Sequence, residues 1–403
     1  MDLRLTPEQE ALRKEFEDFF RGEMKNAPPH WEGTLEAVYG TEEGWALHRH
    51  IAHKLGQRGW LALAWPREYG GQERPIVEQM LFSEVQGYHL APGVDPFGIG
   101  MLAPTLLVAA SDEQKAEFLP PMARGELVWC QLWSEPNAGS DLANLASTAT
   151  KDGDHYIING QKIWTTGAHR AAWGFGLFRT DPTQKRSKGL SFILVDMKTP
   201  GIDVRPLKDM ANNHMFNEVF LDNVRVPVKN RVGEENQGWA VTRMTMNFER
   251  SSIGVFARQK RFLEELVRCC KETEWNGEPL SNSVLTRHRL AEIGIEVEVG
   301  LALAHRVAWT QHQMSSGQAR IEDMIALASG TKVWSSELGQ RSASDATAIL
   351  GLHGQVKRGS HWAPMGGFYE NEFQTCLGYN IGAGTSEIQR NLVAWTALGL
   401  PRV

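Results

Sequence analysis

Two stretches of this sequence decide its fold class: residues 133–141, which read Trp-Ser-Glu-Pro-Asn-Ala-Gly-Ser-Asp, and residues 160–167, which read Gly-Gln-Lys-Ile-Trp-Thr-Thr-Gly. The first is a turn broken by proline and glycine, and it offers backbone amides and two hydroxyls as an anion-accepting loop does. Short β-type runs accompany the two stretches, at residues 128–133 and 156–158. We therefore expect both stretches to belong to a β domain.

The predicted β domain continues along the chain. Residues 159–160, Asn-Gly, are a two-residue hairpin signal. Turn signals separate the further β-type runs, which occupy residues 173–180, 190–196, 202–207 and 218–226. This pattern predicts an antiparallel sheet.

Helical periodicity precedes and follows the β-type runs. Thr6 with Gln9 and Ser111 with Gln114 are capping-box starts, and Pro7 is suited to a first helical position. The apolar spacing predicts helices near residues 7–20, 45–55, 76–88, 113–122, 239–271, 281–315, 321–348 and 386–398. The sequence thus predicts an α+β multi-domain protein, with a helical domain over residues 1–126, an antiparallel β domain over 127–235 and a helical bundle over 236–403.

Composition excludes several classes of protein. The chain has 403 residues, is 42% hydrophobic and carries a net charge of -6, so it can bury substantial cores but presents no basic field for nucleic acid or an anionic membrane. Its four cysteines lack metal-ligand spacing, which favours a reducing cytoplasm. We find no signal-peptide core and no membrane-spanning apolar run. His48, His50 and His53 are interpreted as a polar helix face, so no metal site is predicted.

Two further segments follow the opening stretches: a strand at residues 219–227 and a tail at residues 384–391, which reads Gly-Thr-Ser-Glu-Ile-Gln-Arg-Asn. The four segments occur in the order found in acyl-CoA dehydrogenases. The sequence resembles that family over nearly its whole length. The resemblance implies FAD bound between a β domain and a C-terminal bundle. It also implies dehydrogenation of an acyl-CoA thioester to a trans-2-enoyl-CoA, with an electron-transfer flavoprotein as electron acceptor.

The resemblance also assigns cofactor contacts. Ser134 would contact the pyrimidine edge of the flavin, and Ser140 would lie near the pyrophosphate and the thioester arm. Trp164 would stack on the isoalloxazine, and Thr166 would bond near N5. The complete predicted set is Gln131, Trp133, Ser134, Gly139, Ser140, Trp164, Thr166, Arg287, Thr385 and Glu387.

Abstraction of a proton α to a thioester requires a carboxylate base in a dry pocket. One family position for this base, just before the Gly-Thr-Ser tail, is Ala383 here, so the side chain is absent and only its backbone N–H remains as an oxyanion donor. The other family position, on the first helix of the bundle, is Glu249, followed by the matching Arg250. Glu249 is therefore the predicted base, with apolar neighbours that would raise its pKa.

Some family features are missing. Thr273 stands where an arginine normally reaches FAD phosphate across a subunit interface, and Arg287 is the predicted substitute. The double-glycine loop at residues 348–354 has lost its glutamine. These departures resemble a bacterial subgroup that pairs a catalytic subunit with a degenerate one, so a homotetramer and a heterotetramer with a paralogue both stay open. A non-catalytic or partner-dependent subunit and a flavin oxidase on the same fold are the alternative functions.

Residues 92–100 interrupt the helical pattern where the family that this sequence resembles lines its acyl pocket. Small residues there are expected to leave volume, which favours a branched or polycyclic acyl group over a short straight one.

Overall fold

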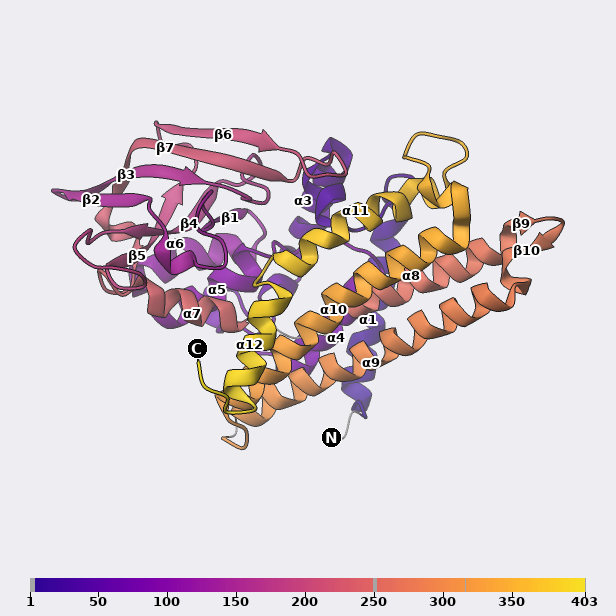
Figure 1. Cartoon of the computed structure of the whole chain (residues 1–403). Helices are drawn as coiled ribbons and strands as arrows, with labels where there is room; N and C mark the ends of the chain where they lie inside the picture. Colours follow the sequence, from indigo (N-terminus) through magenta and orange to yellow (C-terminus); the bar gives the residue numbers. More distant parts are fainter. Residues whose placement is uncertain (1–3, 249–251, 316, 403) are drawn as a thin grey trace. The chain divides into compact units, whose positions relative to one another are not determined.

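The computed structural model describes residues 4–248, 252–315 and 317–402, and its contacts divide the chain into two compact units (Figure 1). The β unit lies within residues 34–74 and 92–249, and the helical unit lies within residues 1–33, 75–91 and 250–403. The N-terminal third of the chain thus contributes to both units. The predicted α+β class, with helices first, then the β-sheet and then further helices, is confirmed, while the predicted domain borders stay a prediction.

The β unit is built on a sheet of eight strands in the order β6-β7-β3-β2-β4-β5-β8, with β1 paired to β4. The strands are β1 Trp129–Leu132, β2 Thr148–Asp152, β3 His155–Lys162, β4 Trp173–Arg179, β5 Leu190–Asp196, β6 Ile202–Leu207, β7 Phe216–Pro227 and β8 Arg231–Val232. Figure 1 shows β6, β7, β3 and β2 as neighbours at one side of this unit.

The sheet is not wholly antiparallel, which corrects the prediction. β1 pairs with β4 in parallel, and β2 meets β4 in parallel at Thr148 and Arg179. A parallel pair needs a long crossover connection, and the segment between β1 and β4 supplies one by forming the β2–β3 hairpin on the way. Periodicity along single strands carries no information about such pairing.

The Asn159-Gly160 hairpin signal was also wrong. Both residues lie inside β3, where the register with β7 shifts between Ile158 and Gly160. Gly160 adopts φ +152°, and a Cβ there would lie 2.1 Å from the Ser147 hydroxyl oxygen, so the glycine serves a β-bulge and a close approach. The β2–β3 turn is instead formed at Gly153, between the paired residues Asp152 and His155.

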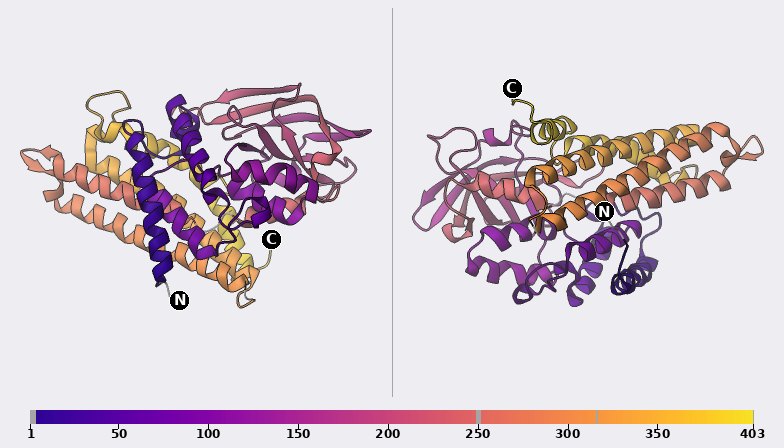
Figure 2. Two further views of the ribbon diagram at one scale, coloured as in Figure 1. Left: turned by 180° about the vertical axis from the view of Figure 1, so that it is seen from behind. Right: turned by 90° about the horizontal axis from the view of Figure 1, so that it is seen from below.

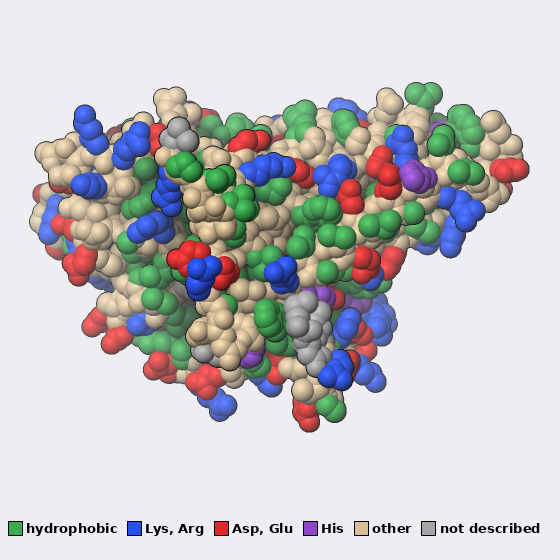
Figure 3. Space-filling model, turned by 60° about the horizontal axis from the view of Figure 1, so that its bottom comes forward, with side chains coloured by type: hydrophobic (Ala, Val, Ile, Leu, Met, Phe, Trp, Pro, Cys, Tyr) green, Lys and Arg blue, Asp and Glu red, His purple; other side chains and the backbone are tan. Residues whose placement is uncertain are grey.

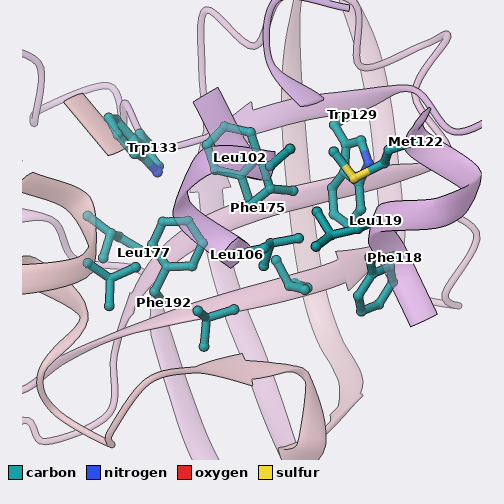
Figure 4. Close-up of a cluster of buried hydrophobic side chains, with 14 of the residues drawn as sticks. Leu102, Leu106, Phe118, Leu119, Met122, Trp129, Trp133, Phe175, Leu177 and Phe192 are labelled. Carbon is teal, nitrogen blue, oxygen red and sulfur yellow. The ribbon is translucent and has the colours of Figure 1, made fainter. Parts of the chain in front are cut away.

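Alternating side chains of the sheet enter two hydrophobic cores. On one face, Phe175 of β4 and Phe192 of β5 join Trp129 in a cluster with the helices of this unit (Figure 4). On the other face, Phe178 and Ile193 from the same two strands join the second cluster. Burial of both faces explains why β4 and β5 read as nearly continuous apolar runs.

Helices and one π-helical turn complete the β unit. They are α2 Leu35–Tyr39, α3 Glu42–Gln57, the π-helix Gly98–Leu102, α5 Ala103–Ala109, α6 Asp112–Ala123 and α7 Gly238–Phe248. The Ser111 capping box of α6 is present as predicted. On α3, His50 and His53 are exposed, but His48 is buried at 2% exposure, which corrects its placement on a polar face. His48 packs inward because its ring stacks on Trp45 and its Nδ1 accepts a hydrogen bond from the Gly93 N–H at 3.1 Å.

The segment expected to leave space for a bulky acyl group is closely packed at two of its glycines. A Cβ on Gly93 would lie 2.7 Å from an Ile51 methyl, and a Cβ on Gly98 would lie 2.4 Å from an Asp95 carboxylate oxygen and 2.7 Å from Trp129. These glycines permit close approach of neighbouring atoms, so the inference that they leave empty volume was wrong.

The helical unit contains α1 Pro7–Glu23, α4 Ile76–Tyr88, α8 Ile253–Glu272, α9 Val284–Ser315, α10 Ile321–Leu350, α11 Phe368–Ile381 and α12 Ser386–Thr396. Helix α1 begins with the predicted Thr6 capping box. Helix α10 packs against α9, α11 and α12, and the views in Figures 1 and 2 agree that α9 and α10 run side by side. The hairpin of β9 Glu274–Trp275 and β10 Glu278–Pro279 was not predicted, although its Asn276-Gly277 loop, with φ +54° and +80°, is the usual signal.

Three further observations concern the classes excluded by composition. Figure 3 shows positive and negative side chains interspersed over one face of the molecule. None of the described helices is both long and apolar enough to span a membrane. Within the described ranges, no three His, Cys, Asp or Glu side chains gather as metal ligands would, and the four cysteines are free.

Candidate functional site

The turn after β1 is ordered by its own backbone. The N–H of Glu135 donates to the carbonyl of Ala138 and the N–H of Ala138 donates back, both at 3.0 Å, so Pro136 and Asn137 form a tight two-residue loop. Gly139 and Ser140 follow on the surface, and a Cβ at Gly139 would meet no atom within 4 Å. Ser140, predicted to lie near the pyrophosphate, and Gly139, predicted to contact the cofactor, therefore lie on open, exposed backbone.

The segment after β3 holds a tryptophan in an unusual conformation. Trp164 has φ +58°, a left-handed value that a bulky side chain rarely adopts, and it remains 54% exposed. Its ring meets Phe216 edge to face, with the ring centroids 5.5 Å apart. Backbone outliers of this kind cluster at functional sites, where the surrounding structure enforces them.

Hydrogen bonds to two neighbouring residues, Asn217 and Met215, hold the backbone next to Trp164. The N–H of Thr165 donates to the carbonyl of Asn217 at 3.0 Å, and the N–H of Gly167 donates to the carbonyl of Met215 at 2.8 Å. The buried side chain of Asn217 donates to the Thr165 carbonyl at 3.0 Å and contacts His169 Nδ1 at 3.1 Å. Thr165 and Gly167, which flank Thr166, are thereby held on β7 and on the loop that precedes it.

The structure brings the two sequence stretches together. The N–H of Ile163 donates to the carbonyl of Ser134 at 2.9 Å, which places Ser134 beside the residue that precedes Trp164. The hydroxyls of Ser134 and Thr166 are partly exposed, and neither has a hydrogen-bond partner among the described residues. An exposed aromatic side chain and two hydroxyls without a described partner thus lie on two segments that a backbone hydrogen bond joins.

A buried ion pair joins the chain neighbours of Ser134 and Ile163. Lys162 is fully buried, and its Nζ contacts Glu135 Oε1 at 2.8 Å. Burial lowers the pKa of the Lys162 ammonium, and Glu135 opposes that effect. Burial also acts to raise the pKa of Glu135, but Lys162 and the hydrogen bonds from Ser147 and Ala146 outweigh it and lower this pKa below its ordinary range. Both groups are charged near neutral pH.

The other predicted contacts of β1 are less exposed. Gln131 is half-buried, with Nε2 3.9 Å from the Met101 sulfur. Trp133 is buried at 6% exposure, and its Nε1 has no hydrogen-bond partner among the described atoms. Trp133 meets Phe175 edge to face at 6.0 Å, so this tryptophan is part of the sheet core.

The helical unit carries the remaining predicted contacts. Ala383 is exposed with φ +54°, its carbonyl accepts from Gln389 Nε2 at 3.0 Å, and its N–H makes no hydrogen bond within the described chain. Thr385 caps α12 by accepting from the Ile388 N–H at 3.2 Å. Glu387 is exposed in the first turn of α12, where backbone hydrogen bonding lowers its pKa.

Arg287 lies in the first turn of α9 and is exposed. It forms no ion pair with any described residue. A cation at a helix N-terminus is unfavourable for the helix dipole, so Arg287 is available for an external anion. The two predicted catalytic residues Glu249 and Arg250 follow α7 in the sequence but lie outside the described residues.

Three residues of this site were missed by the sequence reasoning, namely Glu135, Lys162 and Asn217. Lys162 had a recognisable signal, because alternation along residues 156–162 places it on the same face as Tyr156 and Ile158. A charged residue on an inward strand face requires a buried partner. No comparable pattern marks Asn217.

Comparisons with known proteins agree with this architecture. The sequence matches the family models for the acyl-CoA dehydrogenase N-terminal, middle and C-terminal domains over residues 6–126, 130–224 and 236–398. Acyl-CoA dehydrogenase FadE26 of Mycobacterium tuberculosis is 35% identical over 406 aligned residues, with 100% of this chain and 99% of that protein covered.

Two solved structures are similar over the full length of both chains. A chain of the ChsE4-ChsE5 complex from Mycobacterium tuberculosis is 34% identical with a TM-score of 0.85. A chain of the Tcur3481-Tcur3483 steroid ACAD is 31% identical with a TM-score of 0.86, and for each structure 100% of this chain and 100% of the other is covered. Sequence and fold agree from one end to the other, and this chain is an oxidoreductase that belongs to the acyl-CoA dehydrogenase family.

Proposed function

We propose that this chain binds FAD, dehydrogenates an acyl-CoA thioester to a trans-2-enoyl-CoA and passes the electrons to an electron-transfer flavoprotein. The observation that carries the proposal is the arrangement around Trp164. A half-exposed indole with a left-handed backbone, and the hydroxyls of Ser134 and Thr166 that no described residue contacts, lie on two segments joined by the hydrogen bond from Ile163 to Ser134. Members of this family are flavoproteins, and these residues fit the group that such a site would hold.

The fit rests on the chemistry of the donors. A flavin has a flat ring with a polar edge, so an exposed aromatic side chain and free hydroxyls suit its two kinds of surface. Gly139 and Ser140 would face the pyrophosphate with open backbone, and Arg287 would offer a free guanidinium. Bound FAD would supply the acceptor for the hydride released from the β carbon.

The chain's own residues would handle the proton and the thioester. Glu249 would remove the α proton, since the alternative base position is Ala383 and carries no acid. The free N–H of Ala383 would donate to the thioester carbonyl as its negative charge develops. Arg250 would accompany the base, as the family arginine does. All three roles follow from the sequence match.

The partner of this chain is proposed to be another acyl-CoA dehydrogenase subunit, either a second copy or a paralogue. Three apolar residues one turn apart on α11, namely Phe373, Leu377 and Ile381, are exposed at 46%, 37% and 67%. Such a stripe on a helix is typical of an oligomer interface. Thr273 in place of the family arginine and the heteromeric ChsE4-ChsE5 relative favour a paralogue.

The substrate is proposed to be a CoA thioester of a branched or polycyclic acyl group. Neighbouring atoms pack closely at Gly93 and Gly98, so these glycines do not themselves leave space for a bulky acyl group. Support comes from the relative described as a steroid ACAD, which covers the whole of this chain.

Purification with a visible spectrum, alone and after co-expression with a neighbouring paralogue, tests the function. We expect a flavin band that bleaches anaerobically when a suitable acyl-CoA is added. A colourless chain that stays colourless with every partner would refute the proposal. Rapid oxygen consumption by the reduced protein would indicate a flavin oxidase instead.

Mass measurement tests the partner separately. A fully flavinated homotetramer formed by the chain alone would exclude an obligatory paralogue. Leu377→Glu should then dissociate the assembly, since a charge cannot be buried unpaired in an apolar interface. The matched control is Glu372→Gln on the same helix.

A further inference from the structure

The ammonium group of Lys162 is fully buried and completely satisfied. Its Nζ donates to Glu135 Oε1 at 2.8 Å, to the Leu177 carbonyl at 2.9 Å and to the Trp133 carbonyl at 3.3 Å. A lysine has three N–H donors, and each has its own acceptor here. These acceptors belong to two separate parts of the β unit, because Leu177 is in β4 and the other two are in the turn after β1.

Glu135 is satisfied in the same way. Its carboxylate accepts from Lys162, from the Ala146 N–H at 2.6 Å and from the Ser147 N–H at 3.0 Å. The last two donors lie in the connection that leads into β2. The ion pair therefore joins the end of β3, the strand β4, the turn after β1 and the start of β2.

Glu135 and Lys162 are close in sequence to the predicted ligand-binding residues Ser134 and Trp164. Ser134 lies between Trp133 and Glu135, both of which contact Lys162, and its own carbonyl accepts from Ile163. Trp164 comes two residues after Lys162. A displacement of Lys162 would therefore move Ser134 relative to Trp164.

We propose that Glu135 and Lys162 are a positioning pair that holds Ser134 in register with Trp164 and Thr166, and thereby sets the geometry of the flavin site. The inference rests on the proposed function. Neither residue needs to touch the cofactor, because each acts through the backbone of the two stretches.

A positioning role for this ion pair differs from a contribution to the free energy of unfolding. A buried ion pair is costly to desolvate and is often no more stabilising than apolar residues of similar volume. Its hydrogen bonds are directional, however, and fix the neighbouring carbonyls in a way that apolar packing does not. A methionine at position 162 would fill the volume but would leave the carbonyls of Trp133 and Leu177 without their donor.

The test compares Lys162→Met, Lys162→Arg and the double variant Glu135→Gln with Lys162→Met. Arg225→Met is the matched control, since Arg225 forms an exposed ion pair with Asp152 in the same sheet. For each protein we would measure thermal unfolding, amide hydrogen exchange of the peptide containing Ile163 without FAD, and the spectrum and reduction rate with FAD.

We expect Lys162→Met to speed amide hydrogen exchange at Ile163 by roughly tenfold or more. The reason is that the hydrogen bond from Ile163 to the Ser134 carbonyl no longer has the adjacent ion pair to hold it. With FAD, the flavin band should shift and reduction at saturating substrate should slow by about tenfold or more. The double variant should recover thermal stability relative to Lys162→Met, since no unpaired carboxylate stays buried, but should keep the fast exchange and the slow reduction. Lys162→Arg should restore slow exchange and fast reduction in part. Arg225→Met should change neither the exchange rate nor the reduction rate.

Normal exchange and a normal spectrum in a folded Lys162→Met protein would overturn the positioning role. So would a double variant in which stability, exchange and reduction all recover together, because that result indicates a merely structural pair. Should Lys162→Met fail to fold, the double variant alone supplies the comparison. If the wild-type chain binds no FAD, the proposed function fails, and hydrogen exchange still decides whether the pair positions the two stretches.

Discussion

Asn217 and Thr165 are joined reciprocally in the β unit. The N–H of Thr165 donates to the carbonyl of Asn217 at 3.0 Å, and Nδ2 of Asn217 donates to the carbonyl of Thr165 at 3.0 Å. Asn217 is fully buried, and its Oδ1 lies 3.2 Å from His214 Nε2. One residue, through its backbone carbonyl and its side chain, thus satisfies both the N–H and the carbonyl of Thr165, which separates Trp164 from Thr166.

Asn217→Ala is expected to lower the free energy of unfolding by about 1–3 kcal/mol, because it leaves the Thr165 carbonyl buried without a donor. The left-handed conformation of Trp164 should relax, which would change its fluorescence. Chemical denaturation and tryptophan emission measure the two effects. Arg225→Ala on the same strand is the control, since an exposed ion pair contributes only about 0–1 kcal/mol. Equal effects of the two substitutions would contradict this role for Asn217.

Glu249→Gln is expected to leave FAD bound and to slow flavin reduction by at least about a hundredfold, the lower range for loss of a positioned general base. The reason is that Ala383 leaves position 249 as the carboxylate that matches the family base. Stopped-flow bleaching of the flavin band measures the rate. Glu272→Gln, at an exposed position of α8, should reduce normally. Near-normal reduction by Glu249→Gln would remove Glu249 from the mechanism.

The buried ring of His48 is expected to make stability depend on pH. Burial lowers the pKa of His48 to about 3, whereas the unfolded chain binds this proton near its ordinary pKa of 6.5. As the pH falls, the unfolded state therefore binds this proton before the folded state does. The stability that neutral His48 contributes is complete above pH 6.5 and is lost progressively as the pH falls toward about 3. The loss is about 2 kcal/mol between about pH 7 and about pH 5.

Urea denaturation at several pH values tests this expectation. His48→Gln should flatten the dependence by that amount, because glutamine can still accept from the Gly93 N–H but does not titrate. His50→Gln is the control, since His50 is exposed on the same helix. An unchanged pH dependence in His48→Gln would show that another group is responsible.

Substrate preference is expected to rise with acyl size. In apolar pockets each methylene contributes only about 1–3 kcal/mol to discrimination, so activity should fall gradually as the acyl group shrinks. Values of kcat/KM for butyryl-, octanoyl-, isobutyryl- and steroid side-chain CoA thioesters measure this trend. A clear optimum at butyryl-CoA would show that the pocket is closed to bulky groups.

The sequence by itself determined the type and the order of most elements, although α2, α5, α11, β2, β9 and β10 were not predicted. Local rules account for this, since the Thr6 and Ser111 capping boxes, the apolar run of β5 and the long helical periods act between residues that are close along the chain. The family was also legible in the sequence, because its motifs are short and their residues are contiguous.

Only the tertiary structure decided how the strands pair and what surrounds the two stretches. The parallel pairing of β1 with β4, the bulge at Gly160 and the burial of His48 each depend on a neighbour that is distant in sequence. The same holds for Lys162, whose three acceptors come from the turn after β1 and from β4. A buried charge is tolerated only where folding brings its partners together, and no local pattern specifies that meeting.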